Sequence, residues 1–416
     1  MIFGKENKEK AIKEIYQVPE VKISLIGGTG SGKSTFLSGL IYSMSQNCTD
    51  FSNGCSISLK PADVITINSS INETSDEINE VRNIRDYDDI ITGSTPINDN
   101  NDVKNEKNEK KRPDALQIGS KLKEYVGLDK DFNKATSTRS TSNFEMVFDV
   151  LVNGEKTVKV VFDDYAGEII NQSNGKDIPP IMQDYLMKQI FSSDSFIVLI
   201  SSKTLCENVE RNCQLNSKRS MFNETKLGDA LAKYNIQNII TDIDKKNCTL
   251  LLTITQIDHP DLDKSAISKE IKRDNFSRTC YDLKYYIFKN IFNHAKNMEW
   301  SSGVVPVSAI GMKDTNEKNV NDQNELKADA DLHPEGIDTA VLFCVFSELL
   351  KKIRDYNIEI QNINKKIIKT DGDRIKKWSL SKQIDVAEKV IKTINSDRDY
   401  FSSIYEKNIP FITDID

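Results

Sequence analysis

A short glycine-rich segment near the start of the chain constrains its fold more than any other feature. Residues 27–34 match the pattern G-x-x-x-x-G-K-[ST]. The fixed positions are Gly27, Gly32, Lys33 and Ser34. An apolar stretch of strand length, residues 21–26, precedes the segment, and an amphipathic stretch with helical spacing, residues 35–44, follows it. The sequence therefore predicts a strand, a tight glycine-rich turn and a helix in immediate succession.

This arrangement is suited to phosphate binding. The glycines let the backbone curl so that its N–H groups point at phosphate oxygens, and the start of the helix adds partial positive charge. Lys33 is expected to neutralise the outer phosphates of a nucleoside triphosphate and to act in catalysis, while the Ser34 hydroxyl binds Mg²⁺. The other residues expected to contact the nucleotide in this loop are Gly27, Thr29, Gly30, Ser31, Gly32 and Thr35.

Strand-length and helix-length stretches alternate along the rest of the chain. The expected strands are residues 21–26, 144–152, 157–162, 196–200, 249–254 and 304–307. The expected helices are residues 35–44, 179–191, 225–241 and 281–297. Several strands are rich in Val and Ile without clean alternation, which is typical of strands covered on both faces of a parallel sheet. We therefore expect an α/β three-layer sandwich with a mostly parallel sheet.

One strand of this sheet is expected to be antiparallel. Apolar and polar residues alternate from 144 to 152 and again from 158 to 162, and Asn153-Gly154 separates the two runs. Asn-Gly between alternating runs is the strongest short-range signal for a β-hairpin. An antiparallel strand should therefore directly precede the strand that ends at Asp163-Asp164.

Charge and composition make nucleic acid, a structural metal site and a membrane span unexpected for this chain. The chain has 56 Lys and Arg against 63 Asp and Glu, a formal net charge of −7, so nucleic acid is not expected as a partner. The seven cysteines form no C-x-x-C pair, which indicates reduced thiols rather than a structural metal site. No secretory signal core and no run of about 18 apolar residues is present, so we expect no membrane span and a cytoplasmic location.

Later segments indicate which nucleotide the loop holds. Asp164 and Gly167 form D-x-x-G after a strand, where the carboxylate can hold a Mg²⁺-bound water and the glycine N–H can meet the γ-phosphate. Asp258 follows the buried strand 249–254, and its carboxylate can accept hydrogen bonds from N1–H and the 2-amino group of guanine, which adenine cannot supply. Only the Asp258 segment bears on the base, and it favours guanine.

Taken together, these segments resemble the TRAFAC class of P-loop GTPases, with a Ras-like core, and are most similar to bacterial double-GTPase-like proteins. The resemblance covers residues 21–311 and implies the P-loop NTPase sandwich. It aligns Thr255, Gln256 and Asp258 with the box [NT]-K-x-D. It also aligns Ser308 and Ala309 with S-A-x-G, whose backbone N–H groups meet the guanine carbonyl. The chain departs from the family at Gln256, where the family has a Lys that packs over the base.

The resemblance also implies switch residues. A Thr shortly before the antiparallel strand should bind Mg²⁺, and Thr141 is the first candidate and Thr138 the second. Arg139 resembles the internal arginine of Gα subunits, although a solvated surface arginine is the alternative. Glu168 stands where Ras-like proteins place a water-orienting Gln. A carboxylate there cannot donate to the γ-phosphate, so slow hydrolysis is expected, with Asp163 or a partner protein completing the site.

The polar parts of the chain set its expected organisation. Residues 46–135 are expected to be a polar insertion in the form of a flexible loop, with one candidate helix near residues 122–128. Helical spacing returns after residue 335, and a second helix with an apolar stripe is expected to fold back on the first after a break at Asp371-Gly372. The expected units are an N-terminal extension, 1–18; a G domain, 19–358; and a C-terminal helical appendage, 359–416.

The sequence thus predicts a Mg²⁺-dependent protein that binds GTP or GDP, hydrolyses GTP slowly and acts as a switch for a protein effector, in bacterial signalling or defence. A homodimer is also considered. One alternative is a nucleotide-bound scaffold with little hydrolysis, which Glu168 and Gln256 favour. The other is an ATPase built on the same core.

Overall fold

The computed structural model describes residues 18–28, 31–46, 48–68, 81–85, 142–164, 187–209, 219–231, 233–257, 276–309, 334–366 and 370–410. Ten strands within these residues form one sheet, in the order β10-β9-β8-β7-β1-β6-β5-β3-β2, and β4 pairs with β3. The strands are β1 (Glu20–Ile26), β2 (Thr49–Asp50), β3 (Ser56–Asn68), β4 (Val81–Arg85), β5 (Ser142–Val152), β6 (Glu155–Asp164), β7 (Ser195–Ser201), β8 (Thr249–Thr255), β9 (Ser301–Pro306) and β10 (Tyr405–Asn408).

The middle of the sheet is parallel. Strands β9, β8, β7, β1 and β6 pair in parallel, whereas β5, β3, β2, β4 and β10 join through antiparallel pairing. Every residue of β7 and of β8 is buried, as expected for strands covered on both faces. The expected α/β sandwich with a parallel centre is confirmed, but five strands join through antiparallel pairing where one such strand was expected.

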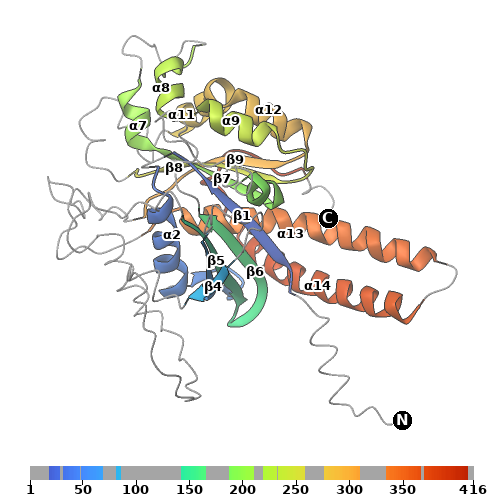
Figure 1. The fold of residues 1–416 in the computed structure, drawn as a ribbon. Helices are drawn as coiled ribbons and strands as arrows, with labels where there is room; N and C mark the ends of the chain where they lie inside the picture. Colours follow the sequence, from blue (N-terminus) through green and yellow to red (C-terminus); the bar gives the residue numbers. More distant parts are fainter. Residues whose placement is uncertain are drawn as a thin grey trace, which may run out of the picture.

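Helices cover both faces of the sheet (Figure 1). One hydrophobic core joins the sheet to α2 (Lys33–Ile41), its π-helical continuation η1 (Tyr42–Gln46), α13 (Ile337–Lys365) and α14 (Asp371–Asn395). The helices of the second core are α7 (Ser202–Glu207), α8 (Glu224–Ala230), α9 (Lys233–Thr241), α11 (Phe276–Asp282), η5 (Leu283–Ile287) and α12 (Lys289–Asn297). Among the described helices, none combines the length and the apolar character that a membrane span requires.

The predicted hairpin between β5 and β6 is present. Asn153 and Gly154 have φ of 51° and 79°, and β5 and β6 pair antiparallel on either side of them. Positive φ at both central residues is the conformation of the type I′ turn, which matches the twist of the two strands. The antiparallel strand therefore lies directly before the strand that ends at Asp164.

The C-terminal helices form the expected antiparallel hairpin. The apolar stripe of α14 is buried against α13 and the sheet; it consists of Ile384, Ala387, Ile391 and Ile394. A break between the two helices was expected at Asp371-Gly372. These two residues instead form the first turn of α14. Thr370 caps this turn because its side chain accepts from Asp373 N–H, and the Asp373 carboxylate accepts from Thr370 N–H.

The structure corrects three further expectations. A flexible loop was expected throughout 46–135, but β2, β3 and β4 lie within this range, and β3 pairs with β5 along most of its length. One helix was expected over 225–241, and the chain forms two, α8 and α9. The region after residue 359 was expected to be helical, and β10 instead adds an edge strand beside β9.

Candidate functional site

The glycine-rich loop follows β1 at the point where the order of strands reverses. Because β1 lies between β6 and β7 and all three are parallel, their carboxyl ends meet at one edge of the sheet. The chain runs from β1 through β5 to β6 on one side and then crosses to β7 on the other. Ligands of open parallel sheets bind outside the carboxyl ends at such a reversal. The predicted phosphate loop therefore occupies the position that the topology favours for a ligand.

Two glycines of the loop occupy positions that other residues fit poorly. A Cβ on Gly27 would overlap the Ser31 hydroxyl and lie 3.0 Å from the Leu199 carbonyl oxygen. Gly32 has a φ of +90°, and a Cβ there would lie 3.3 Å from Thr255 Oγ1. Residues with a side chain rarely adopt this backbone conformation. The first and second glycines of the motif are therefore required by the loop itself.

The side chain of Lys33 folds back onto this loop. Its Nζ donates to the carbonyl oxygens of Gly27 at 2.6 Å and Gly28 at 3.3 Å, and the residue is only 7% exposed. A buried ammonium group is costly unless acceptors surround it, and the loop carbonyls are such acceptors. The Ser31 hydroxyl is also buried and has no hydrogen-bond partner among the described residues. The loop thus holds a cation and an unsatisfied polar group together.

Hydrogen bonds that involve β7, the start of α7 and the loop fix the end of β8 in place. Thr255 Oγ1 donates to the Ser31 carbonyl at 2.8 Å. Gln256 has a φ of 58°. Ser201 Oγ donates to its side-chain Oε1 at 2.7 Å, and Ser202 Oγ donates to its carbonyl at 2.6 Å. Sequence reasoning identified Thr255 and Gln256 but missed both serines, whose only signal is that they follow the apolar run of β7.

The segment after β9 lies beside the first helix. Ser308 is buried and exchanges backbone hydrogen bonds with Glu335, at 3.0 and 2.8 Å. Ala309 packs so closely against α2 that a Cβ on Gly39 would lie 3.0 Å from the Ala309 Cβ. The structure therefore brings the predicted S-A segment to α2, the helix that begins with Lys33.

The end of β6 lies next to β1, as the predicted D-x-x-G strand should. Asp164 pairs in register with Leu25 of β1. Asp163 has a different environment from the one expected, because it is buried and forms an ion pair with Lys22 Nζ at 3.6 Å. This contact engages Asp163 within the sheet rather than in the site that it was suggested to complete.

Several predicted residues lie outside the part that the structure describes. They are Thr29, Gly30, Thr138, Arg139, Thr141, Gly167, Glu168 and Asp258. Ser34 and Asp164 belong to α2 and β6, but their side chains are outside the described part as well. Thr35 is half-buried in the first turn of α2. The described residues thus bring together the loop, Lys33, Thr255, Gln256, Ser308 and Ala309 at one edge.

Comparisons with known proteins give only distant structural likenesses. No family model matches the sequence, and no curated protein matches it. The chain is similar to the S. cerevisiae Ski7 GTPase-like domain bound to GDP and inorganic phosphate, with 15% identity, a TM-score of 0.33, and coverage of 82% of this chain and 52% of that one. It is also similar to a chain of an oligomerised bacterial dynamin pair, with 13% identity, a TM-score of 0.30, and coverage of 93% and 52%. The chain thus spans about half the length of these structures, and likeness at this level does not identify a ligand.

Proposed function

We propose that the chain is a Mg²⁺-dependent GTP-binding protein that hydrolyses GTP slowly and whose nucleotide state controls binding to a protein partner. The observation that carries the proposal is the buried Lys33 ammonium group, held inside a glycine loop at the reversal point of a parallel sheet. A triphosphate presents oxygens that Lys33 can bind in place of the loop carbonyls. The helix dipole of α2 adds to this attraction.

The described residues fit such a ligand. The absence of side chains at Gly27 and Gly32 leaves the backbone free to approach phosphate oxygens, and the unpaired Ser31 hydroxyl can donate to one. Ser34, Asp164 and Thr141 are the proposed residues for Mg²⁺, which when bound neutralises charge on the β- and γ-phosphates. The Gly167 N–H is proposed to meet the γ-phosphate.

The guanine base is proposed to lie between the ends of β8 and β9. Asp258, three residues beyond Thr255, would accept from N1–H and the 2-amino group, and the N–H groups of Ser308 and Ala309 would meet the carbonyl. Gln256 is neutral where a lysine was expected. Its side-chain oxygen is bound to Ser201, so its stem is fixed at this edge of the sheet.

Slow hydrolysis is proposed because of the residue after Gly167. Glu168 can accept a hydrogen bond from the attacking water but cannot donate one to the γ-phosphate, and its charge opposes that phosphate. Arg139 is proposed to offset charge in the transition state, an effect worth about 10³–10⁵ in rate where an arginine does so. In single-turnover experiments, Glu168→Ala should change the rate of phosphate release. An unchanged rate would show that the residue has no catalytic role.

Competition between GTP and ATP tests the choice of nucleotide. With a fluorescent GDP analogue on the full chain, GTP should displace the analogue at a concentration about 100-fold lower than ATP. Asp258→Ala should remove this preference. Asp244→Ala, which changes an exposed carboxylate before β8, is the matched control and should leave it intact. Equal competition by ATP would favour the ATPase alternative.

A nucleotide-bound scaffold with little hydrolysis remains the second candidate. Gln256, which Ser201 binds, replaces the Lys of the family, and Glu168 replaces the water-orienting Gln. The lifetime of bound GTP separates the two functions. If GTP dissociates faster than it is hydrolysed, the scaffold is favoured. If hydrolysis ends each binding event, the switch is favoured.

A further inference from the structure

A polar cluster lies inside the sheet, just below the end of β6. Neighbouring side chains along a strand point to opposite faces, and Ser24 of β1 pairs in register with Asp163 of β6. Lys22, two residues before Ser24, therefore shares their face. Of the three, Asp163 and Ser24 are buried, at 2% and 0% exposure. Such a cluster is costly unless its charges are paired.

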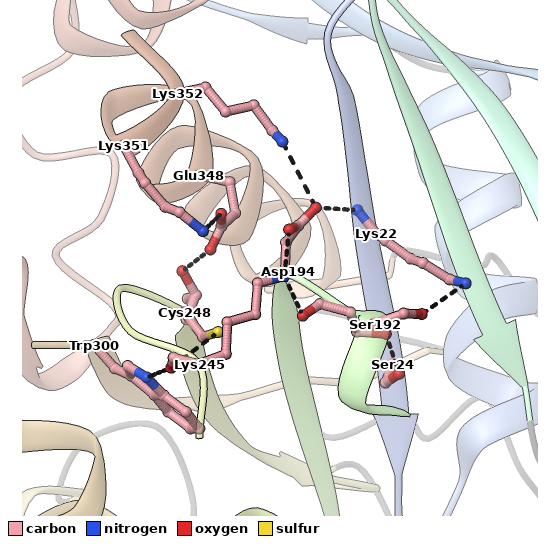
Figure 2. A network of polar contacts seen from close by, with 12 residues as sticks. Lys22, Ser24, Ser192, Asp194, Lys245, Cys248, Trp300, Glu348, Lys351 and Lys352 are labelled. Carbon is pink, nitrogen blue, oxygen red and sulfur yellow. Dashed lines mark hydrogen bonds and ion pairs between the residues drawn. The ribbon is translucent and has the colours of Figure 1, made fainter. Parts of the chain in front are cut away.

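Lys22 joins two segments that are distant in sequence. Its Nζ forms the ion pair with Asp163 at 3.6 Å, directly before Asp164. The same Nζ donates to Gln189 Oε1 at 2.7 Å. It also donates to Ser192 Oγ at 3.2 Å, and Figure 2 labels both Lys22 and Ser192. Gln189 and Ser192 belong to the helical residues 187–192. One ammonium group thus contacts both Asp163 of β6 and the helical residues 187–192.

A second set of hydrogen bonds repeats this connection. Ser193 Oγ donates to Asp163 Oδ2 at 3.5 Å and lies 2.6 Å from Ser24 Oγ. The backbone of Lys22 donates to Asp194 Oδ2 at 3.1 Å, and Asp194 N–H donates to the Lys22 carbonyl at 2.9 Å. Residues 193 and 194, directly after the helix, are therefore fixed to the same two residues of β1.

Asp194 anchors this cluster to the rest of the molecule. Lys245 Nζ donates to it at 2.8 Å, and Lys352 of α13 forms an ion pair with it at 3.8 Å (Figure 2). Burial alone would raise the pKa of Asp194, but the charges of Lys352 and Lys245 outweigh burial and hold it below its ordinary value. The carboxylate is therefore ionised at neutral pH, and Lys22 is bound to a fixed part of the fold.

We propose that Lys22 is a positioning residue for the nucleotide site, because it holds together the two ends of the segment that carries Gly167 and Glu168. This role rests on the proposed function, since those residues act only if the loop binds a triphosphate. Lys22 itself lies within the sheet and acts through Asp163, Gln189 and Ser192.

Substitution of Lys22 by methionine tests the role. Lys22→Met keeps the aliphatic stem and removes the charge and the donors. Lys159→Met is the matched control, because Lys159 also links β6 to β1, through an ion pair with Glu20 at 2.7 Å. Lys22→Arg keeps the charge and should restore the wild-type behaviour. Each full-length variant is examined by hydrogen exchange without nucleotide and by single-turnover hydrolysis.

Lys22→Met should raise amide exchange in residues 187–192 by about tenfold or more, whereas Lys159→Met leaves it unchanged. GTP hydrolysis should slow by about tenfold with the affinity for GDP kept, since the loop of Gly27 and Lys33 is untouched. Wild-type exchange in Lys22→Met, or faster exchange with unchanged hydrolysis, would overturn the positioning role. A wild-type chain that does not bind GTP would contradict the proposed function as well, and the wild type alone reveals that outcome.

Lys22→Met leaves the Asp163 carboxylate buried without this partner, and the chain could fail to fold for that reason alone. The double variant Lys22→Met, Asp163→Asn removes both charges and keeps the core neutral. It should fold and still show faster exchange in 187–192 together with slower hydrolysis. Wild-type values for both measurements in the double variant would show that the pair positions nothing.

Discussion

At the scale of single residues, the conformation of Gly32 decides whether the loop after β1 can form. Its φ of +90° is unfavourable for any residue with a side chain, and Thr255 Oγ1 lies where a Cβ would point. Gly54 has a similar φ of +75°, but nothing lies within 4 Å of a Cβ there. Both glycines therefore need a positive φ. Only at Gly32 would a side chain also come close to a neighbouring residue, Thr255.

We expect Gly32→Ala and Gly54→Ala each to lower the free energy of unfolding by about 1–2 kcal/mol, because both force alanine into the left-handed region. Only Gly32→Ala should also weaken GDP binding, by about tenfold or more, since it moves the loop against Thr255. Urea unfolding and equilibrium binding measure the two effects. Equal GDP affinity in both variants would contradict the site.

A fully buried carboxylate, Glu348 of α13, makes stability depend on pH. It is 0% exposed and accepts from Thr249 Oγ1 at 3.2 Å, with Lys351 Nζ at 3.5 Å (Figure 2). Burial raises the pKa of Glu348 to about 7, and the charge of Lys351 opposes this only in part. The other charges that act on it are Asp194, which raises the pKa, and Lys352 and Lys245, which lower it.

The sign of the pH effect follows from the two pKa values of this group. The unfolded chain releases the Glu348 proton near pH 4.5, whereas the folded chain keeps it to about pH 7. Between these values the folded state binds more protons, so the free energy of unfolding falls as pH rises, by about 3 kcal/mol in total from this residue. Glu348→Gln should match the wild type near pH 4.5 and exceed it at pH 8. Parallel urea-unfolding curves across this range would contradict the assignment.

At the scale of elements, α14 contributes one side to the core and the other to the surface. Ile391 is 3% exposed and belongs to the core shared with α13 and the sheet, whereas Ile375 on the same helix is 44% exposed. The buried side of α14 therefore belongs to the same hydrophobic core as α13 and the sheet.

Ile391→Ala should lower the free energy of unfolding by about 2–5 kcal/mol, because it leaves a cavity between α14, α13 and β6. Ile375→Ala makes the same chemical change on the surface and should cost less than about 0.5 kcal/mol. Thermal unfolding followed by circular dichroism compares the two variants. Equal melting temperatures would show that the α14 packing is not as described.

The sequence predicted the elements whose patterns are local. Apolar runs located β1, β5, β6, β7, β8 and β9, and Asn153-Gly154 located the turn. Strand β3 was missed because Pro61 and its polar neighbours resemble a loop. The structure accommodates Pro61 at a register shift between Pro61 and Asp63, where one residue is left out of the ladder. Strand β10, with the sequence Tyr-Glu-Lys-Asn, has no apolar pattern and is held by pairing with β9.

For the candidate site too, the sequence predicted the residues of a local motif but not the contacts between strands. The motif identified Gly27, Gly32 and Lys33 because their chemistry depends on neighbours in sequence. The contacts of Ser201 with Gln256, and of Lys22 with Asp163, depend on strand register across the sheet, which no single stretch of sequence specifies.

At the scale of the whole molecule, α13 runs along the sheet from the carboxyl end of β9 to the amino end of β8. Its N-cap is Gly336, where a Cβ would meet the Pro306 carbonyl beside the candidate site, and Glu348 in its middle accepts from Thr249 at the start of β8. Its far half forms the hairpin with α14 that extends beyond the sheet in Figure 1. A conformational change at the glycine-rich loop and a partner bound at the α13–α14 hairpin would therefore both act on α13.

Equilibrium binding of GTP with Mg²⁺ to the full chain tests the central claim most directly. The wild type should bind one GTP, and Lys33→Ala should weaken binding by about 10–100-fold, because a charge-assisted contact to phosphate is lost. Lys60→Ala removes an exposed lysine of β3 and should leave the affinity unchanged. Absence of binding in the wild type, or equal affinity in wild type and Lys33→Ala, would contradict a nucleotide site at this loop.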